Sequence, residues 1–103
     1  MHLEIYNVKS LKINFMEIIE IRVQYKAKQK LEQELKKILT EMENKQMEQP
    51  MKVYKRLNME TDYVILLMNQ SNEITVKDSQ LGIRLSSVLN DYGMVNYSKW
   101  KEM

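Results

Sequence analysis

The feature that most constrains the fold is a change of period in the apolar residues. From Ile18 to Lys26 apolar and polar side chains alternate, with Ile19, Ile21 and Val23 on one face, which is typical of a strand. From about Ala27 to Lys45 leucines and other apolar residues instead recur at helical spacing. A strand followed directly by an amphipathic helix therefore begins the ordered part of the chain.

The middle of the chain predicts a hairpin. Pro50 lies beyond the first helix, and Met51–Met59 is a second strand of mixed polarity. A short polar turn between Asn58 and Asp62 leads to the most apolar segment, Tyr63–Asn69, which we expect to be the third strand.

The last third of the chain repeats the order of helix and strand. Asp78 or Ser79 offers an oxygen to cap a second helix, whose apolar stripe is formed by Leu81, Leu85, Val88, Leu89 and Tyr92. Gly93 stands where a left-handed residue would end this helix. Alternation returns in Val95–Lys101, the fourth predicted strand.

The order strand, helix, strand, strand, helix, strand predicts an α+β fold of the ferredoxin-like βαββαβ type with one antiparallel sheet. In that fold the first and third strands are central and the second and fourth lie at the edges. The polarity agrees, since the second and fourth strands carry the basic residues expected at exposed edges, namely Lys52, Lys55, Arg56, Lys99 and Lys101.

The third strand also predicts a partner. Its two sides, Tyr63, Ile65 and Leu67 on one and Val64, Leu66 and Met68 on the other, are both apolar, whereas the two helices can cover only one face of the sheet. A second copy of the chain could cover the other face. We therefore expect a homodimer.

The domain organisation follows from the same pattern. The βαββαβ unit is complete within residues 16–103, so residues 1–15 are interpreted as an N-terminal extension, although they could form extra extended segments. The absence of Cys, a net charge of only +2 and the lack of a signal peptide or long apolar run predict a cytoplasmic protein that binds neither nucleic acid nor membrane.

Common catalytic patterns are missing. The only histidine is His2 and there are two glycines, so a transition-metal site, a Ser-His-Asp triad and a Gly-rich phosphate loop are not expected. The catalytic residues are unknown. Five sheet residues are the candidates for lining a ligand cavity: Arg22, Gln24, Tyr54, Arg56 and Trp100. Each of them is also explained as an exposed edge residue or, for Trp100, as interface packing.

The element order, with SQLGIRLSSVLNDYG followed by VNYSKW, resembles the antibiotic biosynthesis monooxygenase family of dimeric α+β barrels over about Met16 to Trp100. The resemblance implies a dimer with an internal ligand cavity, and in some members oxidation of aromatic or quinol compounds without metal or flavin. Asn69 stands near the place where better-known members carry Trp, and no His follows His2. Haem degradation is therefore not implied.

Three functions remain open at the level of sequence. The first is a cofactor-independent monooxygenase-like enzyme, in which an Arg would stabilise a developing phenolate between Tyr and Trp side chains. The second is a non-catalytic ligand-binding or dimeric assembly module of the same fold. The third, an RNA-binding domain, is disfavoured because the third strand, YVILLMN, has a single aromatic residue at its start and no basic Gly-aromatic motif for stacking on bases.

Overall fold

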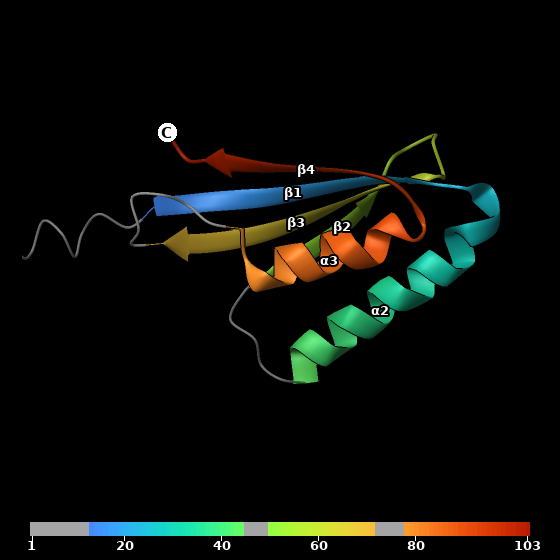
Figure 1. Cartoon of the computed structure of the whole chain (residues 1–103), viewed down its shortest axis with the longest axis horizontal. Helices are drawn as coiled ribbons and strands as arrows, with labels where there is room; N and C mark the ends of the chain where they lie inside the picture. Colours follow the sequence, from blue (N-terminus) through green and yellow to red (C-terminus); the bar gives the residue numbers. More distant parts are fainter. Residues whose placement is uncertain (1–12, 45–49, 72–77) are drawn as a thin grey trace, which may run out of the picture.

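A computed structural model describes residues 13–44, 50–71 and 78–103 of the chain (Figure 1). It contains four strands, two α-helices and one turn of 3₁₀-helix within these residues. In chain order they are β1 (Ile13–Val23), η1 (Tyr25–Ala27), α2 (Lys28–Asn44), β2 (Met51–Lys55), β3 (Asp62–Ser71), α3 (Gln80–Asn90) and β4 (Gly93–Lys101). The element order predicted from the sequence is confirmed.

The strands form one antiparallel sheet in the order β2-β3-β1-β4. β1 and β3 are central, as predicted, and pair in register from Ile13 opposite Ser71 to Arg22 opposite Asp62. β4 pairs with the other side of β1, and the five-residue β2 pairs with β3. This is a small α+β fold compatible with the ferredoxin-like arrangement.

The bounds of β1 differ from the prediction at both ends. The strand begins at Ile13 instead of Ile18, and Phe15 is buried in the described structure. It ends at Val23, because the chain turns at Gln24, whose carbonyl oxygen accepts a hydrogen bond from the Ala27 N–H at 2.8 Å. The sequence alternates as far as Lys26, but Tyr25 and Lys26 belong to the turn η1 and not to the strand. The predicted extension falls mostly on residues 1–12, which lie outside the described residues.

The hairpin between β2 and β3 was predicted, but β2 is shorter than expected. It ends at Lys55, and Asn58 adopts a left-handed conformation with φ of 63°. The Arg56 N–H donates to the Asp62 carbonyl at 2.9 Å and closes the turn. Asparagine tolerates positive φ better than most residues, so Asn58 can occupy the left-handed position that this turn requires.

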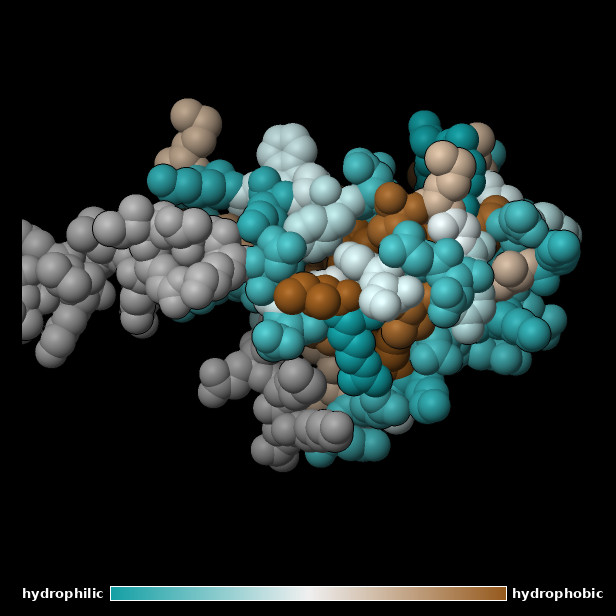
Figure 2. All heavy atoms as spheres, viewed as in Figure 1, coloured by the Kyte–Doolittle hydropathy of each residue, from teal (hydrophilic) through white to brown (hydrophobic). Residues whose placement is uncertain are grey.

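Both helices lie on one side of the sheet (Figure 1). Odd-numbered strand residues point toward them, and the central ones, such as Ile19, Ile65 and Leu67, have no exposed surface. They pack with Leu31 and Leu35 of α2 and the leucines of α3. Figure 2 shows the outcome on this side, where apolar atoms appear near the middle and are surrounded by polar side chains.

The two ends of α3 show one correct and one wrong prediction. Ser79 caps the helix, with its Oγ accepting from the Gly82 N–H at 2.9 Å. Gly93 does not have positive φ and does not end the helix. It begins β4, where an added Cβ would overlap the Arg22 carbonyl oxygen of β1. This glycine is required by close approach between strands.

Within the described ranges, neither helix is long and apolar enough to cross a membrane.

Candidate functional site

The side of the sheet away from the helices, here called the open face, carries the even-numbered strand residues. Strand pairing arranges them in rows across the sheet. At one end lies a charged row, and then come a mixed row, a middle row, an apolar row and an end row. Named from the β2 side to the β4 side, the charged row holds Arg56, Asp62, Arg22 and Met94, and the mixed row holds Tyr54, Val64, Glu20 and Asn96. The middle row holds Lys52, Leu66, Ile18 and Ser98. The apolar row holds Met68, Met16 and Trp100, and the end row holds Gln70 and Asn14.

The charged row is organised around one carboxylate. Arg22 contacts Asp62 through two parallel bonds, Nε to Oδ1 and Nη2 to Oδ2, both at 2.9 Å. Arg56 adds a longer contact from Nη1 to Oδ2 at 3.3 Å. Asp62 is only 14% exposed in its side chain, whereas Arg22 and Arg56 are 57% and 63% exposed. Two guanidinium groups thus enclose a carboxylate and keep their outer surfaces in solvent.

Ionisation in this row follows from the pairing. The hydrogen bonds and charge of Arg22, with smaller contributions from Arg56 and Thr61, lower the pKa of Asp62 to about 2. Asp62 in turn raises the pKa of Arg22. All three side chains are therefore charged at neutral pH, and the bidentate geometry fixes the Arg22 plane.

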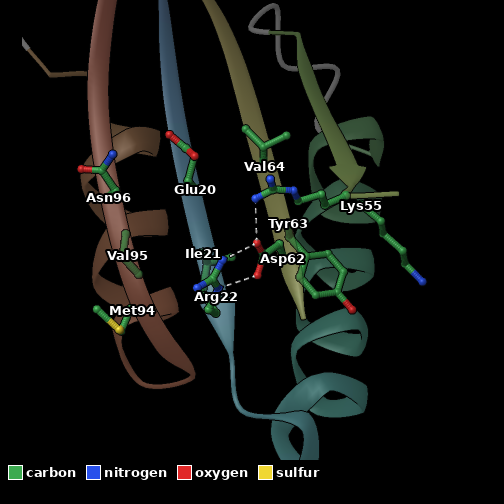
Figure 3. Close-up of a pocket in the computed structure, with 11 residues that line it drawn as sticks. Glu20, Ile21, Arg22, Lys55, Asp62, Tyr63, Val64, Met94, Val95 and Asn96 are labelled. Atoms are coloured by element: carbon green, nitrogen blue, oxygen red, sulfur yellow. Dashed lines mark hydrogen bonds and ion pairs between the residues drawn. The ribbon is translucent and has the colours of Figure 1, made fainter. Parts of the chain in front are cut away.

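A hollow of about 560 Å³ lies over the charged and mixed rows (Figure 3). Its lining includes the salt-bridged residues Arg22, Asp62 and Arg56 and the apolar side chains Val64 and Met94. Met94 is 79% exposed. The hollow therefore places apolar side chains among charged ones, which include Glu20 of the mixed row, and this lining suits a small ligand with both kinds of group.

Toward the opposite end of the open face, the row before the polar end row is apolar. Met16 lies between Met68 and Trp100 in the register, and these two neighbours are 49% and 59% exposed. They border a second hollow, of about 390 Å³. The Trp100 Nε1 donates to the Ser98 Oγ at 2.9 Å, which holds the indole on the sheet. This end has no ion pair of its own among the described residues of the face.

The structure brings together two of the five candidate cavity residues. Arg22 and Arg56 meet on Asp62. Tyr54 lies on the same face, one row away, beside Val64. Trp100 is at the far end of the face, and Gln24 is exposed after the end of β1. Asp62 was missed as a site residue, although its place opposite Arg22 follows once the hairpin register is known.

Lys55 and Tyr63 touch the hollow through their strands but project to the helix side, as Figure 3 shows for both. The Lys55 ammonium pairs with Glu32 of α2 and lies 5.9 Å from the centre of the Tyr63 ring. The Tyr63 hydroxyl donates to Glu32 at 3.1 Å, and burial together with Glu32 raises the pKa of Tyr63 to about 12. This group fastens α2 to the sheet.

A buried carboxylate on the helix side was not predicted. Glu17 of β1 has no exposed surface. It accepts hydrogen bonds from the Asn69 amide at 2.7 Å, from the Ser79 N–H at 3.1 Å and from the Tyr97 hydroxyl. Burial, followed by Glu17, raises the pKa of Tyr97. We call Glu17, Asn69, Ser79 and Tyr97 the glutamate cluster.

A signal for the glutamate cluster existed in the sequence. Glu17 occupies an odd position between Phe15 and Ile19, on the same face as the core. It escaped notice because the strand was expected to begin at Ile18. Gly82 belongs to the same arrangement, since an added Cβ there would overlap the Glu17 carboxylate. The missing side chain of Gly82 therefore leaves room for the Glu17 carboxylate beside the start of α3.

Across residues 13–44, 50–71 and 78–103, no three His, Cys, Asp or Glu side chains come together in a way that could hold a metal ion. Comparison with known protein families, with curated proteins and with solved structures finds no match to the chain. The structure itself shows a small α+β protein with one sheet face that the helices leave uncovered. The monooxygenase resemblance rests only on the residues quoted for it.

Proposed function

We propose that the protein is a homodimeric module that binds a small molecule between the open sheet faces of two copies. The observation that carries this proposal is the apolar centre of the open face. Ile18, Val64 and Leu66 lie in the middle of the two central strands and are half-buried although neither helix covers them. Such a surface is covered in most soluble proteins.

The energetics require that the whole face is covered. Complete burial of a large apolar side chain stabilises by about 1.5–3 kcal/mol, whereas association costs roughly 4–15 kcal/mol. A single side chain is too little. Six apolar residues on the face, Met16, Ile18, Val64, Leu66, Met68 and Trp100, offer a gain of the required size.

Ligand binding is supported by the hollow at the charged row. Val64 and Met94 supply an apolar surface beside the exposed guanidinium groups of Arg22 and Arg56. A planar ligand with a polar edge fits this chemistry, as the small aromatic ligand predicted from the sequence does. Packing a second face over the hollow would exclude water and strengthen each polar contact.

Catalysis stays a prediction from the resemblance. In a monooxygenase-like reaction an Arg would stabilise a developing phenolate, but both Arg22 and Arg56 already contact Asp62. Oxygen uptake with a panel of hydroquinones tests the activity. A rate unchanged by Arg56→Gln would remove that guanidinium from any mechanism.

Light scattering over micromolar concentrations tests the dimer. We expect twice the chain mass for the natural protein and the mass of a single folded chain for Leu66→Lys. Ile83→Lys is the matched control, because Ile83 is 51% exposed on the helix side, away from the open face. A natural protein that is monomeric throughout would contradict the proposal.

Nuclear magnetic resonance with small aromatic acids and alcohols tests ligand binding. Binding should shift the signals of Val64 and Met94, which line the hollow, and leave those of Ile83 unchanged. A dimer that binds none of these compounds at millimolar concentration would limit the proposal to assembly.

A further inference from the structure

We infer that the two copies pack with their like ends together, so that each charged row lies over the charged row of its partner and the two hollows join. This inference rests on the proposed dimer and specifies how it is built. It follows from the unequal halves of the open face, one of which holds the charged row and the other the apolar row and the uncharged end row of Gln70 and Asn14.

The size of the face suits a second copy. Strands lie about 4.8 Å apart and every second residue along a strand advances about 6.7 Å, so four strands and five rows span roughly 19 by 33 Å. The projected area is about 600 Å², before the relief of the side chains is added. A biological interface should bury at least about 1,000 Å² in total, or about 500 Å² from each partner, and a face of this size exceeds that threshold.

Two arrangements are possible for aligned sheets related by a two-fold axis. If the axis runs along the strands, every row meets the same row of the partner, and β1 of one copy lies over β3 of the other. If the axis runs across the strands, the rows meet in reverse order, and β1 lies over β1. The side chains distinguish the two arrangements.

With the axis along the strands, unlike charges and like apolar groups meet. Arg22 of one copy lies over Asp62 of the other, because these residues are direct partners in the β1–β3 register. For the same reason Met16 lies over Met68, and Ile18 lies over Leu66. The two-fold symmetry makes this contact twice, once from Arg22 of each copy to Asp62 of the other.

With the axis across the strands, the charged half of one copy covers the apolar half of the other. Met16 would then lie over Glu20 or Arg22, depending on where the axis crosses. Burying a charge against apolar side chains without a partner costs several kcal/mol. The first arrangement limits this cost to two contacts, Arg56 over Met94 at the edge of the charged row and Val64 over Glu20 in the mixed row.

The ligand site is incomplete in one chain under this arrangement. The hollow over Arg22, Asp62 and Arg56 is open toward the side that the partner covers. The partner contributes a second Arg22, Asp62 and Arg56, so one cavity with two-fold symmetry replaces two separate hollows. It would take one ligand per dimer near the axis, or two at symmetric positions.

A charge exchange tests the arrangement directly. Arg22→Asp makes the charged row acidic, and Asp62→Arg makes it basic. Each variant alone should dimerise at least about tenfold more weakly than the natural protein, because like charges then face each other. An equimolar mixture should recover the dimer, since the carboxylate introduced in one variant then faces the guanidinium introduced in the other. Light scattering would record the recovery.

Cross-linking supplies an independent test. The chain has no Cys, so Gln70→Cys carries a single thiol on the exposed end row. Like ends place the two thiol-bearing backbones about 11 Å apart, from a sheet spacing of about 10 Å and one strand step, whereas reversed ends place them roughly 25–35 Å apart. A short bismaleimide should therefore join two Gln70→Cys chains.

Gln33→Cys, exposed on the outer side of α2, is the matched control and should stay monomeric on denaturing gels while reacting fully with a simple maleimide. A dimer by light scattering without a Gln70→Cys cross-link, or without recovery in the charge mixture, would overturn the inference and leave the proposed dimer standing. A natural protein that is monomeric would overturn both.

Discussion

The two faces of the sheet each hold a carboxylate on a central strand, and they hold it by opposite means. Glu17 on the covered face has no exposed surface and is bound by neutral donors from Asn69, Ser79 and Tyr97. Asp62 on the open face is bound by Arg22 and Arg56, which are both largely exposed.

The difference shows what each face is built for. Water can replace the partners of an exposed ion pair, so Asp62 can exchange its contacts for those of a ligand or a second chain at little cost. Glu17 itself has no exposed surface and its donors are only partly exposed, so breaking these hydrogen bonds leaves polar groups that water satisfies incompletely. The covered face secures the fold, and the open face is suited to binding.

The largest effect should come from Glu17→Ala. This change removes the acceptor that the Asn69 amide, the Ser79 N–H and the Tyr97 hydroxyl share, and it empties a site with no exposed surface. Asn69 keeps the Leu67 carbonyl as an acceptor, whereas an unsatisfied buried donor costs about 1–3 kcal/mol. We expect a loss of about 3 kcal/mol or more in the free energy of unfolding, measured with urea. Glu43→Ala removes an exposed carboxylate of α2, away from both sheet faces, and should change it by less than about 0.5 kcal/mol. Equal losses in both variants would show that the buried position of Glu17 gives it no special weight.

A smaller loss is expected for Gly82→Ala. The new methyl group would overlap the Glu17 carboxylate, and overpacking of this kind typically costs about 1–3 kcal/mol. In the Glu17→Ala background the overlap disappears, so the same change should cost clearly less there. A double-mutant cycle of urea midpoints measures this coupling, and additive effects would show that Gly82 does not act through Glu17.

The smallest effect belongs to Asp62 and depends on pH. Its pKa is about 2 in the folded protein and 3.8 ordinarily, so its stabilising contribution is complete above about pH 4 and is lost as the pH falls toward 2. Stability of the natural protein should therefore decrease over this range more than that of Asp62→Asn. Glu43→Gln, on the exposed side of α2, serves as the control and should not flatten the curve. Parallel curves for the natural protein and Asp62→Asn would contradict the assignment.

The sequence predicted the fold well because its signals are periodic. Alternation and helical spacing placed two helices and four strands, and the basic residues of β2 and β4 placed those strands at the edges. Such patterns depend on burial by the whole element, and a single unusual residue does not alter them.

Individual residues were harder to predict, because their roles depend on contacts between distant segments. Gly93 looks like a helix stop until β4 is seen to approach the Arg22 carbonyl of β1. Glu17 looks like a polar interruption until Asn69 and Tyr97 are placed beside it.

For the same reason, the sequence alone does not show which of the five cavity candidates lie together. Arg22 and Arg56 share a row because both face Asp62 across the sheet. Trp100 has the same face parity but lies at the far end, and this distance follows only from the register of β4 with β1. Gln24 was placed by extending the alternation past the true end of the strand.

The glutamate cluster also affects which elements of the fold can unfold locally. Its members come from β1, β3, the start of α3 and β4, with up to 80 positions between them in the chain. Detaching α3 alone would remove the Ser79 N–H from Glu17 and expose this carboxylate, so opening of the helix is coupled to the sheet through the cluster. Amide hydrogens of α3 should accordingly exchange together with those of β1, as one cooperative unit, whereas α2, which the exposed Lys55 and Glu32 pair helps to fasten, can open earlier.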